Sequence, residues 1–168
     1  MRKFAAAAVG AAALATSLFT AGSASADTGH QVSHSYSALA GTATPTRIGK
    51  VHKFTVPSIK GASGWGNWYW AKLPNYAAFV VVNFNSKDTK ADGKNAGLCY
   101  KLKIPGSAWE DKCIVNTKGV GKTYTQHWWL PKWNQDKLEV QNAVGRLDKA
   151  NNTFYTSAVG KYLKLHWV

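Results

Sequence analysis

Strict alternation of apolar and polar residues is the feature that most constrains the fold of this chain. Residues 98–104, 138–141 and 163–167 each alternate, and residues 77–82 (AAFVVV) form a continuous apolar run. Alternation places the apolar side chains on one face of a half-buried antiparallel strand, whereas the continuous run predicts a central strand buried on both faces. Helical spacing is absent, apart from one helical turn expected over residues 107–112. The sequence therefore predicts an all-β fold.

Clusters of glycine, proline and asparagine separate the alternating segments at short intervals, which is the spacing of a sandwich or barrel. We expect an antiparallel β-sandwich or small barrel of about eight strands, formed as a single domain by residues 47–168. Residues 27–46 are rich in serine, threonine and alanine, and this composition predicts a flexible leader.

Two stretches of the chain, about 47–104 and 113–168, echo each other. Matching residues recur in the same order about 60 residues apart, as expected when one supersecondary unit is used twice. The domain is therefore predicted to consist of two similar halves. The matched positions include Val56 and Val115, Lys60-Gly61 and Lys118-Gly119, Trp70 and Trp128 (or Trp129), Leu73-Pro74 and Leu130-Pro131, Asn83 and Asn142, and Tyr100 and Tyr162.

The first 26 residues have the three parts of a secretory signal peptide. Arg2 and Lys3 supply the positive region, an alanine-rich apolar run extends to about Phe19, and residues 24–26 (ASA) form a cleavage site of small residues. The apolar run is too short and too polar for a membrane-spanning helix. We therefore expect a secreted, extracellular protein without a transmembrane anchor.

The two cysteines, Cys99 and Cys113, form an even count in a chain expected to enter an oxidising compartment. We predict that they form a disulfide, which contributes about 3 kcal/mol by closing a short loop. Two isolated thiols are a poor metal site, and the sequence predicts neither a metal nor a cofactor.

The formal net charge is +13, from 21 lysines and arginines against 8 carboxylates. The basic residues are mostly lysines scattered along the chain. Scattered lysines attract anionic polymers loosely, without the bidentate phosphate recognition of arginine. Acidic glycans and other anionic cell-envelope polymers are the expected partners of this charge, and nucleic acid is the weaker alternative.

Two tryptophan clusters, at residues 65–70 and 128–133, are the main candidates for a binding site. Indole faces stack on sugar rings or bases, and neighbouring polar side chains orient a ligand's hydroxyl groups. We therefore predict a non-catalytic binding module for polysaccharide or a cell-envelope polymer. The alternative is that the indoles fill the core. The candidate binding residues are Trp68, Trp70, Trp128, Trp129, Asn67 and His127.

The second function class is an enzyme, either a small secreted hydrolase or a ribonuclease-like enzyme. Glu139, Arg146 and His166 occur in the order used by small microbial ribonucleases, which need a base, a phosphate-binding group and an acid. The spacings and flanking motifs of that family are absent, so we assign no catalytic residue. A third class is a protein-targeting factor, such as a protease inhibitor or an antagonistic toxin, which would use the polar loop at Ser86–Gly97.

Overall fold

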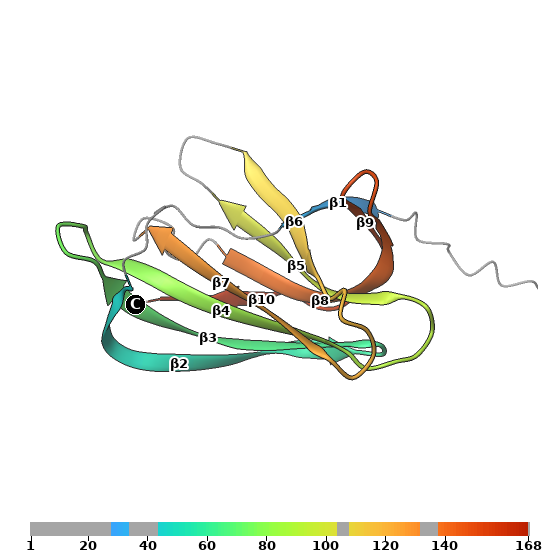
Figure 1. Ribbon diagram of the computed structural model, residues 1–168, viewed down its shortest axis with the longest axis horizontal. Helices are drawn as coiled ribbons and strands as arrows, with labels where there is room; N and C mark the ends of the chain where they lie inside the picture. Colours follow the sequence, from blue (N-terminus) through green and yellow to red (C-terminus); the bar gives the residue numbers. More distant parts are fainter. Residues whose placement is uncertain (1–27, 34–43, 104–107, 132–137, 168) are drawn as a thin grey trace, which may run out of the picture.

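A computed structural model of the protein describes residues 28–33, 44–103, 108–131 and 138–167. These residues form ten β-strands and no helix, which confirms the all-β class and exceeds the expected count of about eight (Figure 1). The expected signal peptide, residues 1–26, lies outside the described residues. The strands are β1 (Thr28–Val32), β2 (Thr46–Ile59), β3 (Ala62–Lys72), β4 (Phe79–Asp88), β5 (Asn95–Lys103), β6 (Trp109–Val115), β7 (Thr123–Pro131), β8 (Leu138–Asp148), β9 (Thr153–Val159) and β10 (Leu163–Leu165).

One layer is a four-stranded antiparallel sheet in the order β2-β3-β4-β7. It is the lower layer in Figure 1. The apolar run at residues 77–82 leads into β4, where residues 79–82 are all buried. β4 pairs with β3 on one side and β7 on the other, so the prediction of a central strand is confirmed for residues 79–82. Ala77 and Ala78 precede the strand, and Ala77 is exposed.

The second layer is a closed barrel of five strands. The pairings run β5-β6-β1-β9, and β8 closes the ring because it pairs with both β9 and β5. β10 extends the wall by pairing with the first residues of β8. The β1–β6 pair is parallel, and the other pairs are antiparallel.

The expected leader is corrected in part by this ring. Residues 28–32 form β1, and β2 already begins at Thr46. β1 fills the slot between β6 and β9, so its polar segment has backbone partners on both sides. Backbone pairing of this kind depends on distant strands, and the local composition carries no sign of it.

A second correction concerns residues 107–112, where a helical turn was expected. β6 begins at Trp109 and pairs with β5 along its length, from Lys103↔Trp109 to Gly97↔Val115. Cys99 and Cys113 are direct partners in this pair and form the predicted disulfide. Pairing with a strongly alternating strand therefore overrides the local preference of the segment.

The two echoing halves do not share one structural unit. In the first half, β2, β3 and β4 form a continuous antiparallel meander in the four-stranded sheet. In the second half, β7 lies in that sheet whereas β6 and β8 belong to the barrel. The matched residues thus occur at similar points of a strand succession, but their strands pair differently.

Two main apolar cores result, and two smaller apolar clusters lie beside them. The larger core lies between the two layers, where the inner face of the four-stranded sheet packs on the wall of the barrel; its largest members include Trp128, Tyr100 and Phe84. The smaller core fills the barrel with residues from all five ring strands: Cys99, Cys113, Val115, Ala143, Phe154, Val32 and Leu147. No helix among the described residues is long and apolar enough to cross a membrane.

Candidate functional site

Among the described residues, no further strand covers the face of the four-stranded sheet that points away from the barrel. At one end of this face Ala71, Phe79 and Val81 are buried and pack against Tyr69 and Trp129. Successive side chains of a strand point to opposite faces. On β3, Gly64, Gly66 and Trp68 are buried, whereas the alternating residues Trp65 and Asn67 are partly exposed. We call this surface the open face. Its central residues are Trp65, Asn67 and Tyr69 on β3, Asn83 and Asn85 on β4, and Thr125, His127 and Trp129 on β7.

Three of the six predicted binding residues lie on the open face: Asn67, His127 and Trp129. The expectation that Trp68 and Trp128 are stacking platforms is corrected, because their exposed fractions are 6% and 0% and both belong to the core between the layers. Trp70 is half-buried and packs against the same core. The indole of Trp68 stacks on His52 and meets Trp167 edge-on.

A row of polar side chains crosses the open face. Asn67 pairs in register with Asn83, and Asn83 pairs with His127. The amide nitrogen of Asn83 donates to Oδ1 of Asn67 at 2.7 Å, and the amide oxygen of Asn83 lies 2.6 Å from Nδ1 of His127. We call these three residues the amide row.

The direction of these bonds fixes the chemistry of His127. The amide nitrogen of Asn83 donates to Asn67, so the atom of Asn83 that faces His127 is the amide oxygen. An amide oxygen only accepts, so Nδ1 of His127 carries the proton of this hydrogen bond. In a neutral imidazole the other nitrogen, Nε2, is then a hydrogen-bond acceptor. The side chain is exposed, which places this acceptor in reach of a ligand's hydroxyl group.

Aromatic rings flank the amide row on both sides. Tyr69 and Trp129 lie one row along the strands, on either side of Val81, which is only 2% exposed. Trp129 also packs on Phe79, with ring centroids 5.5 Å apart. Trp65 lies one row in the other direction. Rows on one face are about 7 Å apart, so amides and rings alternate at that spacing.

The open face is basic. By register, Arg47 and Lys53 of β2 and Lys87 of β4 lie on the same side as the amide row. Among the described residues of these four strands, the one carboxylate is Asp88. It is 3% exposed, and it accepts the backbone N–H of Lys90 at 3.1 Å. Cations on this face are therefore not neutralised by a neighbouring carboxylate of the sheet.

Sequence reasoning missed Trp65, Tyr69 and Asn83 as members of this site. Alternation along β3 from Asn67 was a sufficient signal for Trp65 and Tyr69. Asn83 was noted only as part of the echo, because its place beside His127 depends on the register between β4 and β7.

The residues of the ribonuclease alternative are not assembled. Glu139 and Arg146 are seven residues apart on β8, a separation of about 23 Å along an extended strand. Glu139 pairs with Lys164 at 3.3 Å, and the Arg146 guanidinium lies 5.0 Å from the ring centroid of Tyr155. This arrangement does not place a base and a phosphate-binding group on one substrate.

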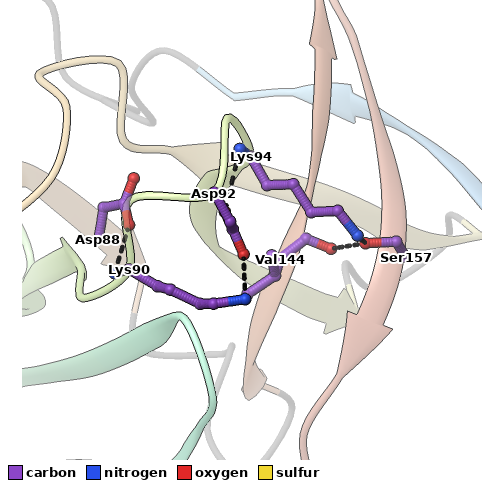
Figure 2. Close-up of polar contacts among 6 residues, drawn as sticks. All are labelled: Asp88, Lys90, Asp92, Lys94, Val144 and Ser157. Carbon is purple, nitrogen blue, oxygen red and sulfur yellow. Dashed lines mark hydrogen bonds and ion pairs between the residues drawn. The ribbon is translucent and has the colours of Figure 1, made fainter.

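The protein-targeting alternative requires the loop between β4 and β5. This loop is held in place by an ion pair and hydrogen bonds (Figure 2). Asp92 forms an ion pair with Lys90 at 3.1 Å and accepts the backbone N–H of Lys94. The hydrogen bond from Lys90 and then that from Lys94 lower the pKa of Asp92. Lys94 Nζ donates to the Ser157 hydroxyl on β9 at 3.0 Å. The loop is thereby anchored to the barrel.

A charged row lines one mouth of the barrel. Lys164, Glu139, Lys101 and Asp111 are consecutive partners across β10, β8, β5 and β6. Asp111 then pairs with Nδ1 of His30 on β1 at 3.0 Å. The charges alternate along this row, and we call the site the barrel mouth.

The barrel mouth is concave. Two adjoining cavities of about 360 and 420 Å³ share Lys101 and Asp111 in their linings. Tyr162 lines the first cavity, and its hydroxyl accepts a hydrogen bond from Gln141 Nε2 at 3.0 Å. Burial, followed by the nearby Asp111 carboxylate, raises the pKa of Tyr162. Trp109 lines the second cavity and is 50% exposed.

Within the part of the chain that the structure describes, one cluster of metal-ligand types occurs, at the floor of this mouth. A ring nitrogen of His30 and the sulfurs of Cys99 and Cys113 lie within 4.8 Å of one another. Both sulfurs are joined in the disulfide, so neither is the thiolate that binds a metal. The cluster is therefore a histidine packed on a disulfide.

Comparison with known proteins gives no relative: no family model, curated protein or solved structure matches the chain.

Proposed function

We propose that the protein is a secreted, non-catalytic binding module that holds an extended anionic polysaccharide or cell-envelope polymer on the open face. The observation that carries this proposal is the amide row of Asn67, Asn83 and His127, which lies between the rings of Trp65 on one side and Tyr69 and Trp129 on the other. Rings and hydrogen-bonding groups that alternate on an open sheet match the alternation of ring faces and hydroxyl groups along a glycan chain.

The shape of the site favours a polymer over a small molecule. The open face extends across four strands, a width of about 15 Å between the outer strands. The face of a sheet encloses little of a small ligand, whereas small-molecule sites are usually concave. A long chain gains affinity from many weak contacts along its length.

The charge favours an anionic polymer over a neutral one. Arg47, Lys53 and Lys87 lie on the open face by register. Exposed cations of this kind raise the local concentration of an anionic chain, and salt screens the attraction. Lysine-rich surfaces without a bidentate arginine pair favour loose polymer binding over specific phosphate recognition.

The proposal is tested by retention on insoluble peptidoglycan, on chitin and cellulose, and on immobilised acidic glycans. We expect strongest retention on the acidic polymers, with release at high salt. Trp129→Ala and His127→Ala should each reduce retention, whereas Tyr76→Ala is the matched control. Tyr76 is 53% exposed in the turn before β4, away from the amide row. Failure of the natural protein to bind any of these polymers would refute the proposal.

A further inference from the structure

We infer that the barrel mouth is a second ligand site, a pocket for one or two rings of a neutral saccharide. It is separate from the open face, because its residues come from the barrel strands and the segment before β10 rather than from the four-stranded sheet. The inference does not rest on the function proposed for the open face.

The position of the pocket follows from the alternation that builds the barrel core. Cys99, Cys113 and Ala143 point into the barrel. Lys101, Asp111 and Gln141 are each two residues further along the same strands, so they point to the same side, above that core. The disulfide crosses β5 and β6 directly below them. Rigid strands and a cross-link therefore hold the polar groups of the mouth in place.

The charges of the row that lines the mouth cancel. Lys164 lies 3.3 Å from Glu139, and His30 lies 3.0 Å from Asp111. Lys101 stands between the two carboxylates in register. Two lysines of this row thus face two carboxylates, with a histidine beside one of them, and Lys103 lies outside the row, at the rim beside Trp109. A pocket whose charges are already paired gives little net attraction to a free ion, so neither an anion nor a cation is its best ligand.

The mouth instead offers several hydrogen-bonding groups around a concave space. Carboxylates accept hydrogen bonds from hydroxyl groups, the Lys101 ammonium donates, and the Gln141 amide and Tyr162 hydroxyl do both. Their arrangement is fixed by internal contacts: Gln141 donates to Tyr162, and Lys101 Nζ lies 5.0 Å from the centroid of the Tyr162 ring. Fixed donors and acceptors of both kinds suit a ligand with many hydroxyl groups and no charge.

Trp109 supplies the apolar wall. Its indole is 50% exposed at the rim of the second cavity, and Lys103 Nζ lies 6.0 Å from its ring centroid. An exposed indole next to carboxylates can cover the apolar face of a sugar ring while the carboxylates bind its hydroxyl groups. Cavities of about 360 and 420 Å³ fall in the usual size range of small-ligand pockets.

The test is calorimetric titration of the full secreted protein with neutral trisaccharides and tetrasaccharides of glucose and of N-acetylglucosamine. We expect one of these to bind, with an affinity that changes less than about twofold between low and high salt, because the site is charge-balanced. Trp109→Ala should weaken binding about tenfold through loss of the stacked ring. Trp129→Ala, on the open face, should leave this affinity unchanged.

A charge variant tests the argument from neutrality. Glu139→Gln removes one carboxylate and leaves the mouth with a net positive charge, so we expect it to gain affinity for the matching uronate oligosaccharide. The inference is overturned if no neutral oligosaccharide binds, if Trp129→Ala rather than Trp109→Ala abolishes binding, or if Glu139→Gln brings no gain for the anionic ligand. Release of shortened products during the titration would also overturn it, because the site would then be catalytic. Retention of acidic polymers by the open face can succeed or fail independently of all four results.

Discussion

Trp128 and Trp129 are adjacent in the chain, yet they lie on opposite faces of β7. Trp128 is 0% exposed and meets Tyr100 and Phe84 edge-on, with ring centroids 4.4 and 4.9 Å away. Trp129 lies on the open face beside Phe79. One strand therefore contributes one indole to the core and one to the candidate binding site.

Alanine substitution should separate these two roles. Trp128→Ala leaves a cavity between the layers and should lower the free energy of unfolding by about 3–5 kcal/mol. Trp129→Ala removes a partly buried ring and should cost less than about 2 kcal/mol. Urea denaturation measures both values. Equal losses in the two variants would contradict the assignment of Trp128 to the core.

The same argument explains which part of the site the sequence could reveal. Alternation shows that neighbouring tryptophans on a strand point in opposite directions, so they cannot both be platforms on one surface. Which of the two points inward depends on the layer that covers the sheet. That layer is the barrel wall, whose strands come from distant parts of the chain.

The fold likewise has parts that local sequence signals predict and parts that they do not. The buried run of β4 and the alternation of β5 and β8 are local signals, and they predicted strands correctly. The β1 strand has no such signal, because it becomes a strand by filling a slot between β6 and β9. The echo failed as a predictor of architecture because similar residues at similar strand positions do not determine strand pairing.

Replacement of both Cys99 and Cys113 by serine should destabilise the protein. The disulfide joins direct partners on β5 and β6 across a sequence separation of 14. Closing a loop of that length is worth about 3 kcal/mol in the unfolded chain, and the variant also buries two hydroxyl groups in the barrel core. We expect a lower denaturation midpoint that reductant no longer changes. A midpoint as high as that of the oxidised natural protein would contradict this role.

Gly66→Ala should distort the part of the sheet that carries the open face. A Cβ at this position would collide with the backbone carbonyl of Asn83 and approach the ring of Phe54 to 2.6 Å. The strands β3 and β4 would have to move apart, at a cost of about 1–3 kcal/mol, and the Asn67–Asn83 hydrogen bond would be disturbed. Ser63→Ala on the same strand is the control. Unfolding and polymer retention are the two measurements, and an unchanged value of both would contradict the close packing.

The stability of the protein should fall at alkaline pH through Tyr162. Burial, and then the Asp111 carboxylate, raises the pKa of the phenol above the ordinary value that it regains on unfolding, about 10. The folded state therefore binds more protons than the unfolded state once the pH exceeds that value, and the free energy of unfolding decreases as pH rises toward the folded pKa. Below about pH 10 the phenol is protonated in both states, so this contribution is fully present.

Tyr162→Phe removes the titration along with the hydrogen bond from Gln141. The variant should be less stable at neutral pH and should lose less stability between about pH 9 and 11 than the natural protein. Denaturation midpoints across that range, with phenolate absorbance recorded in parallel, give the comparison, and parallel curves for the two proteins would show that Tyr162 is not the group responsible.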